Sequence, residues 1–269
     1  MPELPEVEVI RQSLADSVGR HIVDIEVRES RLRKPVDAMR LRSSIGQQIV
    51  GLDRKGKYLI ARLSDHRILV LHFGMSGTVR LVKGAWAWDR HDHVQLVLDG
   101  DLRWVLNDPR RFGLLWVGLE SEAPELSRLG PDALSAEFTA PMLFGATRRS
   151  KRAVKNVLLD QRVVAGVGNI YANEALFLAG IRPSRPGHRL SRPAVARLHE
   201  ALRATLREAI AAGGSSIADF RDGRGRTGYF QLQFRVYDRC GEPCLQCGGT
   251  IRRAVHAGRS SFYCPRCQH

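Results

Sequence analysis

The sequence lacks the features of a membrane or exported protein. No apolar run approaches the roughly 18 residues that a membrane span needs, and no long basic amphipathic helix carries a bulky apolar face. The N-terminus has Glu3, Glu6 and Glu8 where a signal peptide would have basic residues and an apolar core. We therefore expect a cytoplasmic protein, whose thiols stay reduced and whose paired cysteines more often bind metal than form disulfides.

Acidic residues are in deficit. Lys and Arg number 42 against 28 Asp and Glu, which gives a net charge of +14 and a pI near 10.3. Such an excess favours a polyanionic partner, and nucleic acid is the commonest, with an anionic membrane surface as the alternative. The chain has 269 residues, of which 43% are hydrophobic, so it can bury a sizeable core and suits two domains.

The first half of the chain predicts one helix followed by strands. Pro5 suits the first turn of a helix, and Gly19 closes the segment. One face of this helix would carry Val7, Ile10, Leu14 and Val18. The apolar period then changes to two, and Asp99-Gly100 separates two alternating segments, which is a strong hairpin signal. This half therefore predicts a β-sandwich or barrel behind an N-terminal helix.

The second half predicts helices and then a cysteine-rich end. Periodicity weakens over residues 121–146, which indicates a linker. Helices are expected over residues 153–160, over 169–180 with Asn169 as its cap, and over 191–213. The last has one apolar stripe, made of Val195, Leu198, Leu202, Leu206 and Ile210. A Gly/Arg-rich loop at 221–228 precedes the cysteines. The sequence has no internal repeat.

Four cysteines have the spacing of a zinc ribbon. Two CxxC pairs, sixteen residues apart, can place four thiolates around zinc, and a closed four-sulfur shell makes that zinc structural; the ligands are Cys244, Cys247, Cys264 and Cys267. Disulfides are the alternative. Cys240 fits the spacing poorly and is interpreted as a free thiol. The basic residues between the pairs either form a solvated hairpin or press onto phosphates, and a chain this basic favours phosphates.

The N-terminus offers a candidate nucleophile. Initiator methionine is usually removed before proline, which would leave Pro2 with a free secondary amine. An amine that attacks a sugar carbon forms an iminium, an electron sink, and Glu3 lies beside it as an acid or base. Taken alone, a proline at position 2 is more often only a processed chain end.

Together the motifs resemble the bacterial formamidopyrimidine-DNA glycosylases of the formamidopyrimidine glycosylase–endonuclease VIII family. The resemblance runs through the whole chain in order, and its motifs are MPELPEVE at the start, KGKYL at 55–59, HFGMSG at 72–77, NDPRRFG at 107–113, GVGNIYANE at 166–174, GYF at 228–230 and the closing FYCPRCQ.

The resemblance implies catalytic roles for four residues. Pro2 would attack C1′ of the damaged nucleotide and form a Schiff base, and Glu3 would help to open the sugar and release the base. Lys57 would be the proton donor in β-elimination. Arg259 would assist δ-elimination.

The resemblance also implies DNA contacts. His91, Arg110 and Asn169 match positions that contact DNA, and Asn169 at a helix start can hold a phosphate. Met75, Arg110 and Phe112 match the group that fills the gap left by a flipped base. Without the family, Met75 and Phe112 would more simply be core residues.

One basic segment departs from the family pattern. Alignment puts Ser150 where the family has a DNA-contacting lysine. The neighbours Lys151 and Arg149 are the candidates to replace it, and we choose Lys151. The segment TRRSKRAVK keeps five basic residues and no acid, so attraction to the DNA backbone survives either way.

These expectations define one hypothesis. The fold is α+β: an N-terminal helix plus β-sandwich domain (2–130), a hinge (131–149), a helix–two-turn–helix DNA-binding domain (150–230) and a zinc ribbon (231–269). The protein would be a monomeric glycosylase/AP lyase with one structural zinc, excising oxidised purines from damaged double-stranded DNA by β,δ-elimination. The alternatives are an endonuclease VIII-like enzyme for oxidised pyrimidines and a non-catalytic DNA-binding module. Glu174 and the 221–228 loop are candidates for reading the base.

Overall fold

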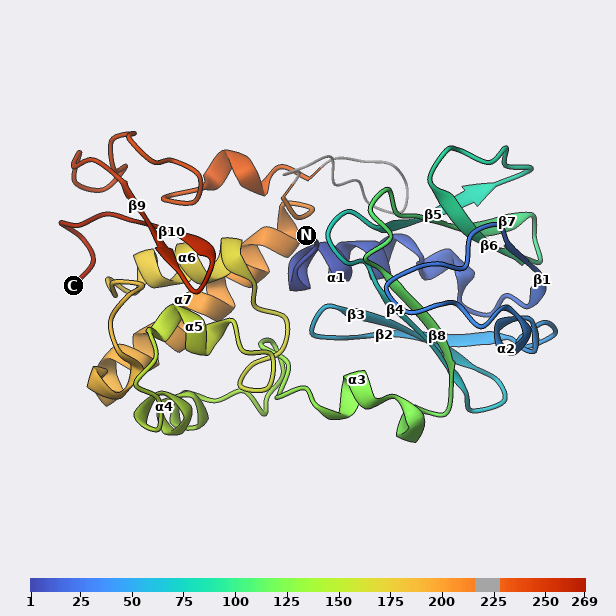
Figure 1. Ribbon diagram of the computed structural model, residues 1–269, viewed down its shortest axis with the longest axis horizontal. Coiled ribbons are helices and arrows are strands. Elements are labelled where there is room, and N and C mark those ends of the chain that lie inside the picture. Colours follow the sequence, from blue (N-terminus) through green and yellow to red (C-terminus); the bar gives the residue numbers. More distant parts are fainter. Residues whose placement is uncertain (216–227) are drawn as a thin grey trace. The chain divides into compact units, whose positions relative to one another are not determined.

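The computed structural model describes residues 1–215 and 228–269 (Figure 1). The chain forms two compact units. Unit 1 comprises Met1–Ser127 and Ala212–Tyr229, and unit 2 comprises Arg128–Ala211 and Phe230–His269. Among the described helices, none combines the length and the apolar character that crossing a membrane requires.

Unit 1 begins with helix α1 (Leu4–Ser13), followed by the 3-10 turn η1 (Ala15–Ser17). The predicted helix ran on to Gly19, but the α-helix ends at Ser13, and Val18, expected on its apolar face, is exposed. The Ser13 and Ser17 hydroxyls donate to the carbonyls of Ile10 (2.7 Å) and Leu14 (2.5 Å), and such local bonds compete with regular helix.

Two four-stranded antiparallel sheets make up most of unit 1. One has the order β1 (Ile22–Val27), β6 (Asp92–Leu98), β7 (Leu102–Asn107) and β5 (Thr78–Lys83). The other has the order β2 (Ile49–Lys55), β3 (Tyr58–Leu63), β4 (Ile68–His72) and β8 (Leu114–Gly118). The short helices α2 (Ala38–Arg42), η2 (Glu120–Glu122) and α3 (Pro124–Ser127) complete the unit. The predicted hairpin at Asp99-Gly100 is confirmed between β6 and β7.

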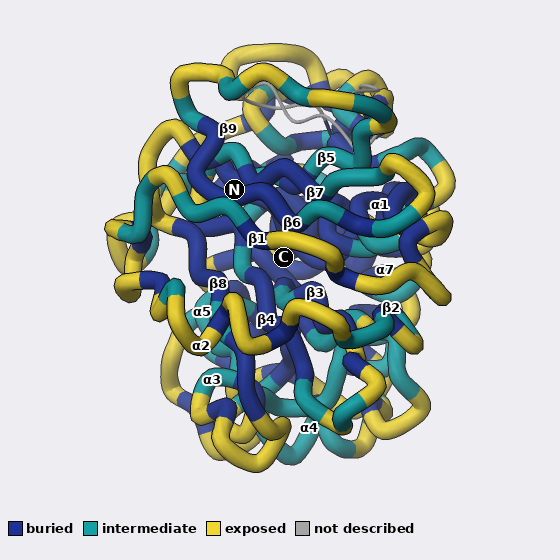
Figure 2. Tube along the Cα trace, turned by 90° about the vertical axis from the view of Figure 1, so that its right-hand side faces the viewer, coloured by how far each residue is buried: buried dark blue, intermediate teal, exposed yellow. Residues whose placement is uncertain are grey.

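The core of unit 1 is made by both sheets and α1. Ile10 of α1, Leu71 of β4 and Trp104 of β7 are almost fully buried in the same cluster. Strands β4 and β6 are buried along most of their length (Figure 2). The predicted sandwich with an N-terminal helix is confirmed, and α1 is fixed in it by its apolar face.

Unit 2 is mainly helical. Its helices are α4 (Ala140–Arg148), α5 (Val154–Leu158), α6 (Asn169–Leu178), η3 (Gly187–Arg189), α7 (Arg192–Ala211) and η4 (Phe230–Gln233). The long α7 packs against α4 and α6. Four residues of its predicted apolar stripe, Val195, Leu198, Leu202 and Leu206, are completely buried, and Ile210 is partly buried.

Two local features differ from the sequence predictions. The expected hinge 131–149 contains α4, because the Thr139 hydroxyl accepts a hydrogen bond from the Met142 amide (3.3 Å) and Leu143 is buried. Gly168, and not Asn169, occupies the N-cap of α6, so Asn169 is the first helical residue.

The ribbon of β9 (Arg252–His256) and β10 (Arg259–Tyr263) packs onto α6. The Asn173 side chain accepts a hydrogen bond from the Phe262 amide (2.8 Å), and Phe177 shares a core with Ile251 and Phe262. Ribbon and helices therefore form one compact unit, although the sequence suggested a separate segment after residue 230.

Candidate functional site

The start of the chain is buried in unit 1. Pro2 and Glu3 are buried, and so is Lys57. Burial lowers the pKa of the Met1 α-amino group; the Lys57 and Arg110 charges lower it further, while Glu3 and Glu6 oppose the change. The four side chains therefore act electrostatically on the terminal amine, and its neutral, nucleophilic form is favoured.

Glu6 connects this site to the segment after α7. One carboxylate oxygen accepts from the Glu3 amide (2.8 Å), and the other accepts from the amide (2.9 Å) and hydroxyl (3.1 Å) of Ser215. The Glu3 side chain bonds in return to the Glu6 amide, which completes a capping box. No role for Glu6 was expected from the sequence. Its E-x-x-E spacing with Glu3 was the signal that could have shown the cap.

Lys57 lies in the tight turn between β2 and β3. Gly56, with a φ of +59°, precedes it in this turn. Burial lowers the pKa of the nearby His72 to about 4, and the charges of Lys57 and Arg33 add to the effect. His72 is therefore neutral at physiological pH, and its Nδ1 accepts a hydrogen bond from the Gly74 amide (3.0 Å).

The three expected wedge residues lie on two exposed loops. Met75 is 40% exposed and Phe112 46% exposed, so neither is a core residue. The Arg110 guanidinium lies over the Phe112 ring at 4.8 Å. The loops are packed together, because a Cβ on Gly74 would lie 2.4 Å from the Phe112 carbonyl carbon. The glycine thus permits a close approach that presents both apolar side chains to solvent.

Asp108 fixes the two wedge loops to each other. Its side chain is fully buried and accepts hydrogen bonds from the Ser76 hydroxyl (3.1 Å), the Arg110 amide (3.3 Å) and the Gly113 amide (2.7 Å). Asp108 was not among the residues expected from the sequence. An aspartate directly after a strand, ahead of a Pro-Arg-Arg turn, was the available signal, since aspartate side chains bond nearby amides in turns.

His91 lines a surface cavity of about 340 Å³ beside these loops. The other lining residues are Arg28, Glu29, Arg90, Asp92, His93, Pro109 and Arg111. Basic side chains outnumber acidic ones in this set. The cavity therefore suits an anionic group such as a phosphate.

In unit 2, Asn169 opens the ten-residue α6, and its Oδ1 is buried without a hydrogen-bond partner among the described residues. Lys151 and Arg149 are exposed, whereas Ser150 is buried and its hydroxyl accepts from Arg152 Nε (3.3 Å) and the Arg152 amide (3.2 Å). The exposed pair can reach a ligand, and Ser150 faces inward.

Arg259 lies at the tip of the β9–β10 hairpin and is exposed. Ala257 and Gly258 form the turn, both with positive φ (49° and 74°), as a two-residue hairpin turn requires. The strand after Arg259 is held by Lys155, which is completely buried and donates to the Ser260 carbonyl (2.5 Å) and the Ser261 hydroxyl (2.8 Å). Sequence analysis counted Lys155 only as part of the basic segment.

The four predicted zinc ligands converge in unit 2. Their sulfur atoms all lie within 4.8 Å of one another, and the pairs Cys244–Cys267 and Cys247–Cys264 are separated by 3.9 and 3.5 Å. A tetrahedron with Zn–S bonds of about 2.3 Å has sulfur–sulfur edges of about 3.8 Å. The four thiols therefore fit one zinc ion and leave it no open position. Cys240 is exposed and lies outside the cluster.

Glu174 has a structural role. It is completely buried, and it accepts hydrogen bonds from the amides of Arg235 (2.9 Å), Val236 (3.0 Å) and Tyr237 (2.8 Å). These contacts commit both oxygens to the chain before the zinc ligands, which is the reason that Glu174 is unsuited to reading a base. The other candidate, the 221–228 loop, lies outside the described residues except for Gly228.

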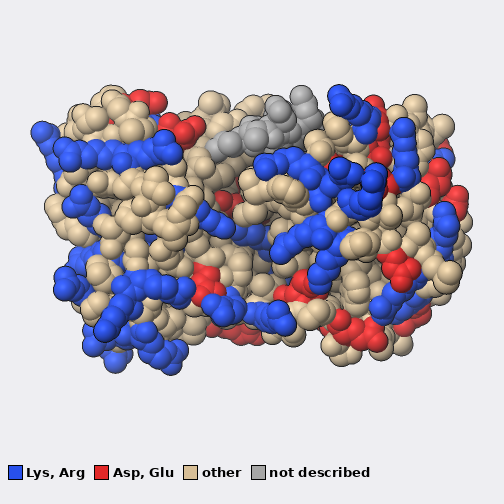
Figure 3. Space-filling view, in the orientation of Figure 1, with Lys and Arg blue, Asp and Glu red and all other residues tan. Residues whose placement is uncertain are grey.

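Lys and Arg side chains are spread over both units on the face shown in Figure 3, and acidic side chains are fewer there. On unit 2 the exposed strand β9 adds Arg252 and Arg253 to Arg259 at the hairpin. Such surfaces attract the phosphate backbone of a nucleic acid without reading its sequence.

Three family models match consecutive parts of the chain. The formamidopyrimidine-DNA glycosylase N-terminal domain matches residues 1–115, and the formamidopyrimidine-DNA glycosylase H2TH domain matches residues 129–221. A zinc finger found in FPG and IleRS matches residues 241–269.

Similar proteins cover the same length. The chain is 48% identical to a formamidopyrimidine-DNA glycosylase of Thiobacillus denitrificans and 47% identical to one of Halorhodospira halophila, each over 100% of both chains. The MutM (Fpg) protein of Thermus thermophilus has a TM-score of 0.88 at 40% identity, covering 99% of this chain and 98% of that one. A Lactococcus lactis Fpg in complex with DNA containing an abasic site has a TM-score of 0.90 at 32% identity, covering 99% of each chain.

Proposed function

The chain belongs to the formamidopyrimidine-DNA glycosylases, and we propose that it excises oxidised purines from double-stranded DNA through a Schiff base on Pro2, followed by β,δ-elimination. Membership makes the protein a DNA base-excision repair glycosylase with a structural zinc ion. The lesion class, the covalent intermediate and the residue roles are the proposal.

The observation that carries the proposal is the buried terminal amine beside Glu3 and Lys57. Removal of Met1 would transfer the free amine to Pro2, which is also buried. A lowered pKa leaves more of an amine neutral at physiological pH, and only the neutral form is nucleophilic.

The chemistry follows from these groups. The Pro2 nitrogen attacks C1′ of the damaged nucleotide, the bond from C1′ to the base breaks, and Glu3 helps to open the sugar ring by proton transfer. The resulting iminium makes the neighbouring C–H acidic. Loss of this proton breaks the sugar–oxygen bond to the phosphate on the 3′ side in β-elimination, with Lys57 as the proton donor. Arg259 assists δ-elimination, which breaks the bond to the second phosphate, on the 5′ side. The product is a one-nucleotide gap.

Base removal requires the nucleotide to leave the stack. Met75, Arg110 and Phe112 would fill the space, and their exposure on two fixed loops supports that role. His91, Lys151 and Asn169 would hold phosphates, and the place of Asn169 in the first turn of the ten-residue α6, where backbone amides lack helical partners, supports that role.

We also propose that the protein acts as a monomer in the cytoplasm, where the bacterial chromosome lies, and that residues 2–130, 131–149, 150–230 and 231–269 correspond to the catalytic, hinge, DNA-binding and ribbon segments. Sedimentation of the zinc-loaded protein would test the first part: a mass near 30 kDa supports a monomer, and a larger species contradicts it.

Two duplexes test the lesion class. One contains 8-oxoguanine and the other thymine glycol, and excision is followed under single-turnover conditions. We expect faster release of 8-oxoguanine. Faster release of thymine glycol would indicate an endonuclease VIII-like specificity. The variants Pro2→Gly and Glu3→Gln should bind the lesion duplex and lose excision; loss of binding by folded variants would contradict the assigned roles.

A further inference from the structure

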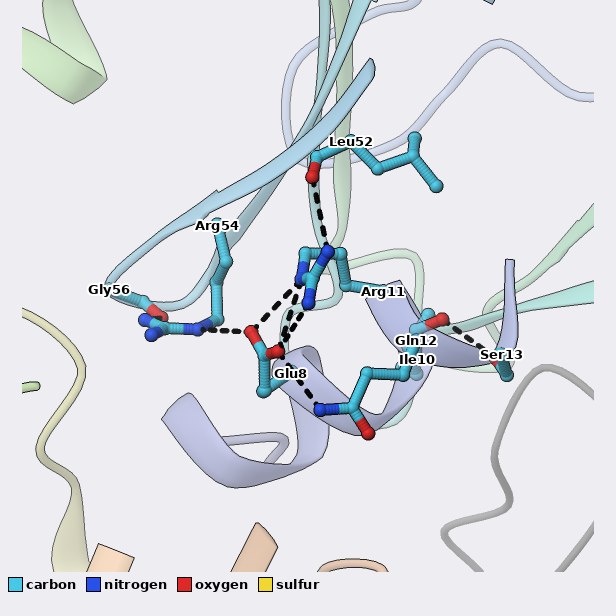
Figure 4. Close-up of polar contacts among 8 residues, drawn as sticks. All are labelled: Glu8, Ile10, Arg11, Gln12, Ser13, Leu52, Arg54 and Gly56. Carbon is cyan, nitrogen blue, oxygen red and sulfur yellow. Dashed lines mark hydrogen bonds and ion pairs between the residues drawn. The ribbon is translucent and has the colours of Figure 1, made fainter. Parts of the chain in front are cut away.

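We propose that Arg54, held by Glu8, is a positioning residue for Lys57 in the elimination step. This inference rests on the proposed role of Lys57. Arg54 is in β2 and Glu8 is in α1, the helix that follows Pro2 and Glu3 (Figure 4). Arg54 Nε donates to Glu8 Oε2 at 3.0 Å, and Arg54 Nη1 donates to the Gly56 carbonyl at 3.2 Å.

The Glu8 carboxylate is fixed from its other side by α1 itself. Arg11 donates to it three times, at 2.7 to 3.1 Å, and Gln12 donates once, at 3.1 Å. Burial would raise the pKa of Glu8, but the bonds and charges of Arg11 and Arg54 outweigh it and lower the pKa, so the carboxylate stays ionised. Arg11 also donates to the Leu52 carbonyl (3.3 Å), in the middle of β2.

The contact between Glu8 and Arg54 is well shielded from water. The exposed fractions of the two side chains are 14% and 9%. A charge-assisted pair at this depth holds its geometry better than an exposed ion pair, which solvent and salt weaken.

The Gly56 carbonyl belongs to the peptide bond that leads into Lys57. Because a peptide group is planar, fixing the direction of this carbonyl also fixes the direction of the Lys57 amide and Cα. Gly56 has a positive φ and, as a glycine, the freedom to adopt other angles. The hydrogen bond from Arg54 therefore restricts rotation of the backbone at Gly56, which would otherwise let the Lys57 side chain move out of position.

A continuous series of contacts thus links the helix that follows the nucleophile to the lysine of the elimination step. It runs from α1 through Glu8 and Arg54 to the Gly56 carbonyl, and then along the chain to Lys57. The nucleophilic end of α1 and the proton-transfer lysine keep a constant separation through this link. Displacement of a reacting group by about 1 Å can cost on the order of 100-fold in rate.

The test separates Schiff-base formation from strand cleavage. Zinc-loaded, Met-processed protein reacts with a duplex containing an abasic site under single-turnover conditions. Borohydride trapping gives the rate of Schiff-base formation, gel analysis gives the rate of cleavage, and the equilibrium affinity for a stable abasic analogue gives binding. The variants are Arg54→Met, Arg54→Lys and Glu8→Gln.

We expect Arg54→Met to slow cleavage by about 10- to 100-fold while trapping and affinity stay unchanged, so that uncleaved covalent adduct accumulates. Glu8→Gln should act in the same direction with a smaller effect, because the amide still accepts one hydrogen bond. Arg54→Lys should cleave faster than Arg54→Met but more slowly than the parent protein. A lysine ammonium lacks the forked guanidinium that reaches both Glu8 and the Gly56 carbonyl.

Arg62→Met is the matched control. Arg62 is in β3 of the same hairpin, opposite Gly51, and makes exposed ion pairs with Asp53 (2.5 Å) and Glu120 (3.1 Å). Cleavage by this variant should equal that of the parent protein. Melting temperatures identify unfolded variants, and if Arg54→Met does not fold, Glu8→Gln carries the test.

Lys57→Met distinguishes the two ways to fail. If Lys57→Met cleaves normally, the proposed role of Lys57 is wrong. If Lys57→Met is slow but folded Arg54→Met cleaves normally, the positioning proposal is overturned. Equal slowing of trapping and cleavage in Arg54→Met would also overturn it, because that pattern indicates general damage to the site.

Discussion

Asp108 provides a sharp test of how the wedge is built, because one buried carboxylate joins the two loops that carry Met75 and Phe112. In Asp108→Asn the side chain keeps its shape, but its NH₂ group replaces one acceptor. If the NH₂ group takes the Oδ2 position, it faces the Gly113 amide, which in the parent protein donates to Oδ2 at 2.7 Å. If the amide is reversed, the bonds from Ser76 and Arg110 are lost instead.

The expected cost follows from these bonds. An unsatisfied buried donor costs about 1–3 kcal/mol, and bonds to a charged acceptor contribute about 1.5–3 kcal/mol each. Since Asp108 is fully buried, solvent cannot replace the lost acceptor, and we expect a loss of about 2–4 kcal/mol in the free energy of unfolding. For a chain of this size, that loss lowers the melting temperature by roughly 5–15 °C.

The assay combines thermal unfolding with two DNA measurements. Asp108→Asn should excise a lesion about 10- to 100-fold more slowly, because the wedge residues are no longer held in place. Binding to undamaged DNA, which depends on phosphate contacts, should not change. The control is Asp89→Asn, since Asp89 is exposed and its pair with Arg80 (3.2 Å) should contribute little. A melting temperature of Asp108→Asn equal to that of the control, or a parallel loss of non-specific binding, would refute this reasoning.

Two further predictions concern zinc and pH. Removal of zinc by a chelator should unfold the ribbon and weaken DNA binding, because the four clustered cysteines are held together by the metal. The control Cys240→Ser should bind zinc and DNA like the parent protein. Retained DNA affinity in verified zinc-free protein would contradict this prediction. The folded-state pKa of Glu8 lies below its unfolded value of about 4.3, so its contribution to stability is present above that pH and is lost as the pH falls through the folded pKa. Glu8→Gln should therefore lower the free energy of unfolding at pH 7, and the difference from the parent protein should shrink below about pH 4 in urea titrations; a difference independent of pH would count against the ion pairs.

The sequence allowed the fold to be predicted where one local pattern decides the structure. Alternation around Asp99-Gly100 defined a hairpin, the apolar stripe of α7 defined a helix, and two CxxC pairs defined a zinc site. The prediction was less accurate for two helices. Helix α4 depends on a tertiary contact, the burial of Leu143, and the end of α1 has serine hydroxyls that bond locally to the backbone and compete with the helix.

The candidate site shows the same division. Residue type pointed to Pro2 and Glu3, and the family resemblance added Lys57. The turn-rich segments around Met75 and Phe112 suggested exposed loops, and both side chains are exposed. Residues that act through buried hydrogen bonds were missed. The partners of Lys155 are distant in sequence, and Asp108 bonds both to the distant Ser76 and to nearby amides. Glu174 was left as a candidate for reading the damaged base, but its hydrogen bonds to three backbone amides indicate a structural role.

The central claim is that the terminal amine of Pro2 is the nucleophile. Met-processed protein is incubated with a duplex containing 8-oxoguanine in the presence of borohydride, and the covalent adduct is digested and mapped by mass spectrometry. The account predicts a reduced adduct on residue 2, which is absent in Pro2→Gly under the same conditions. An adduct on another residue, or none with active protein, would contradict it.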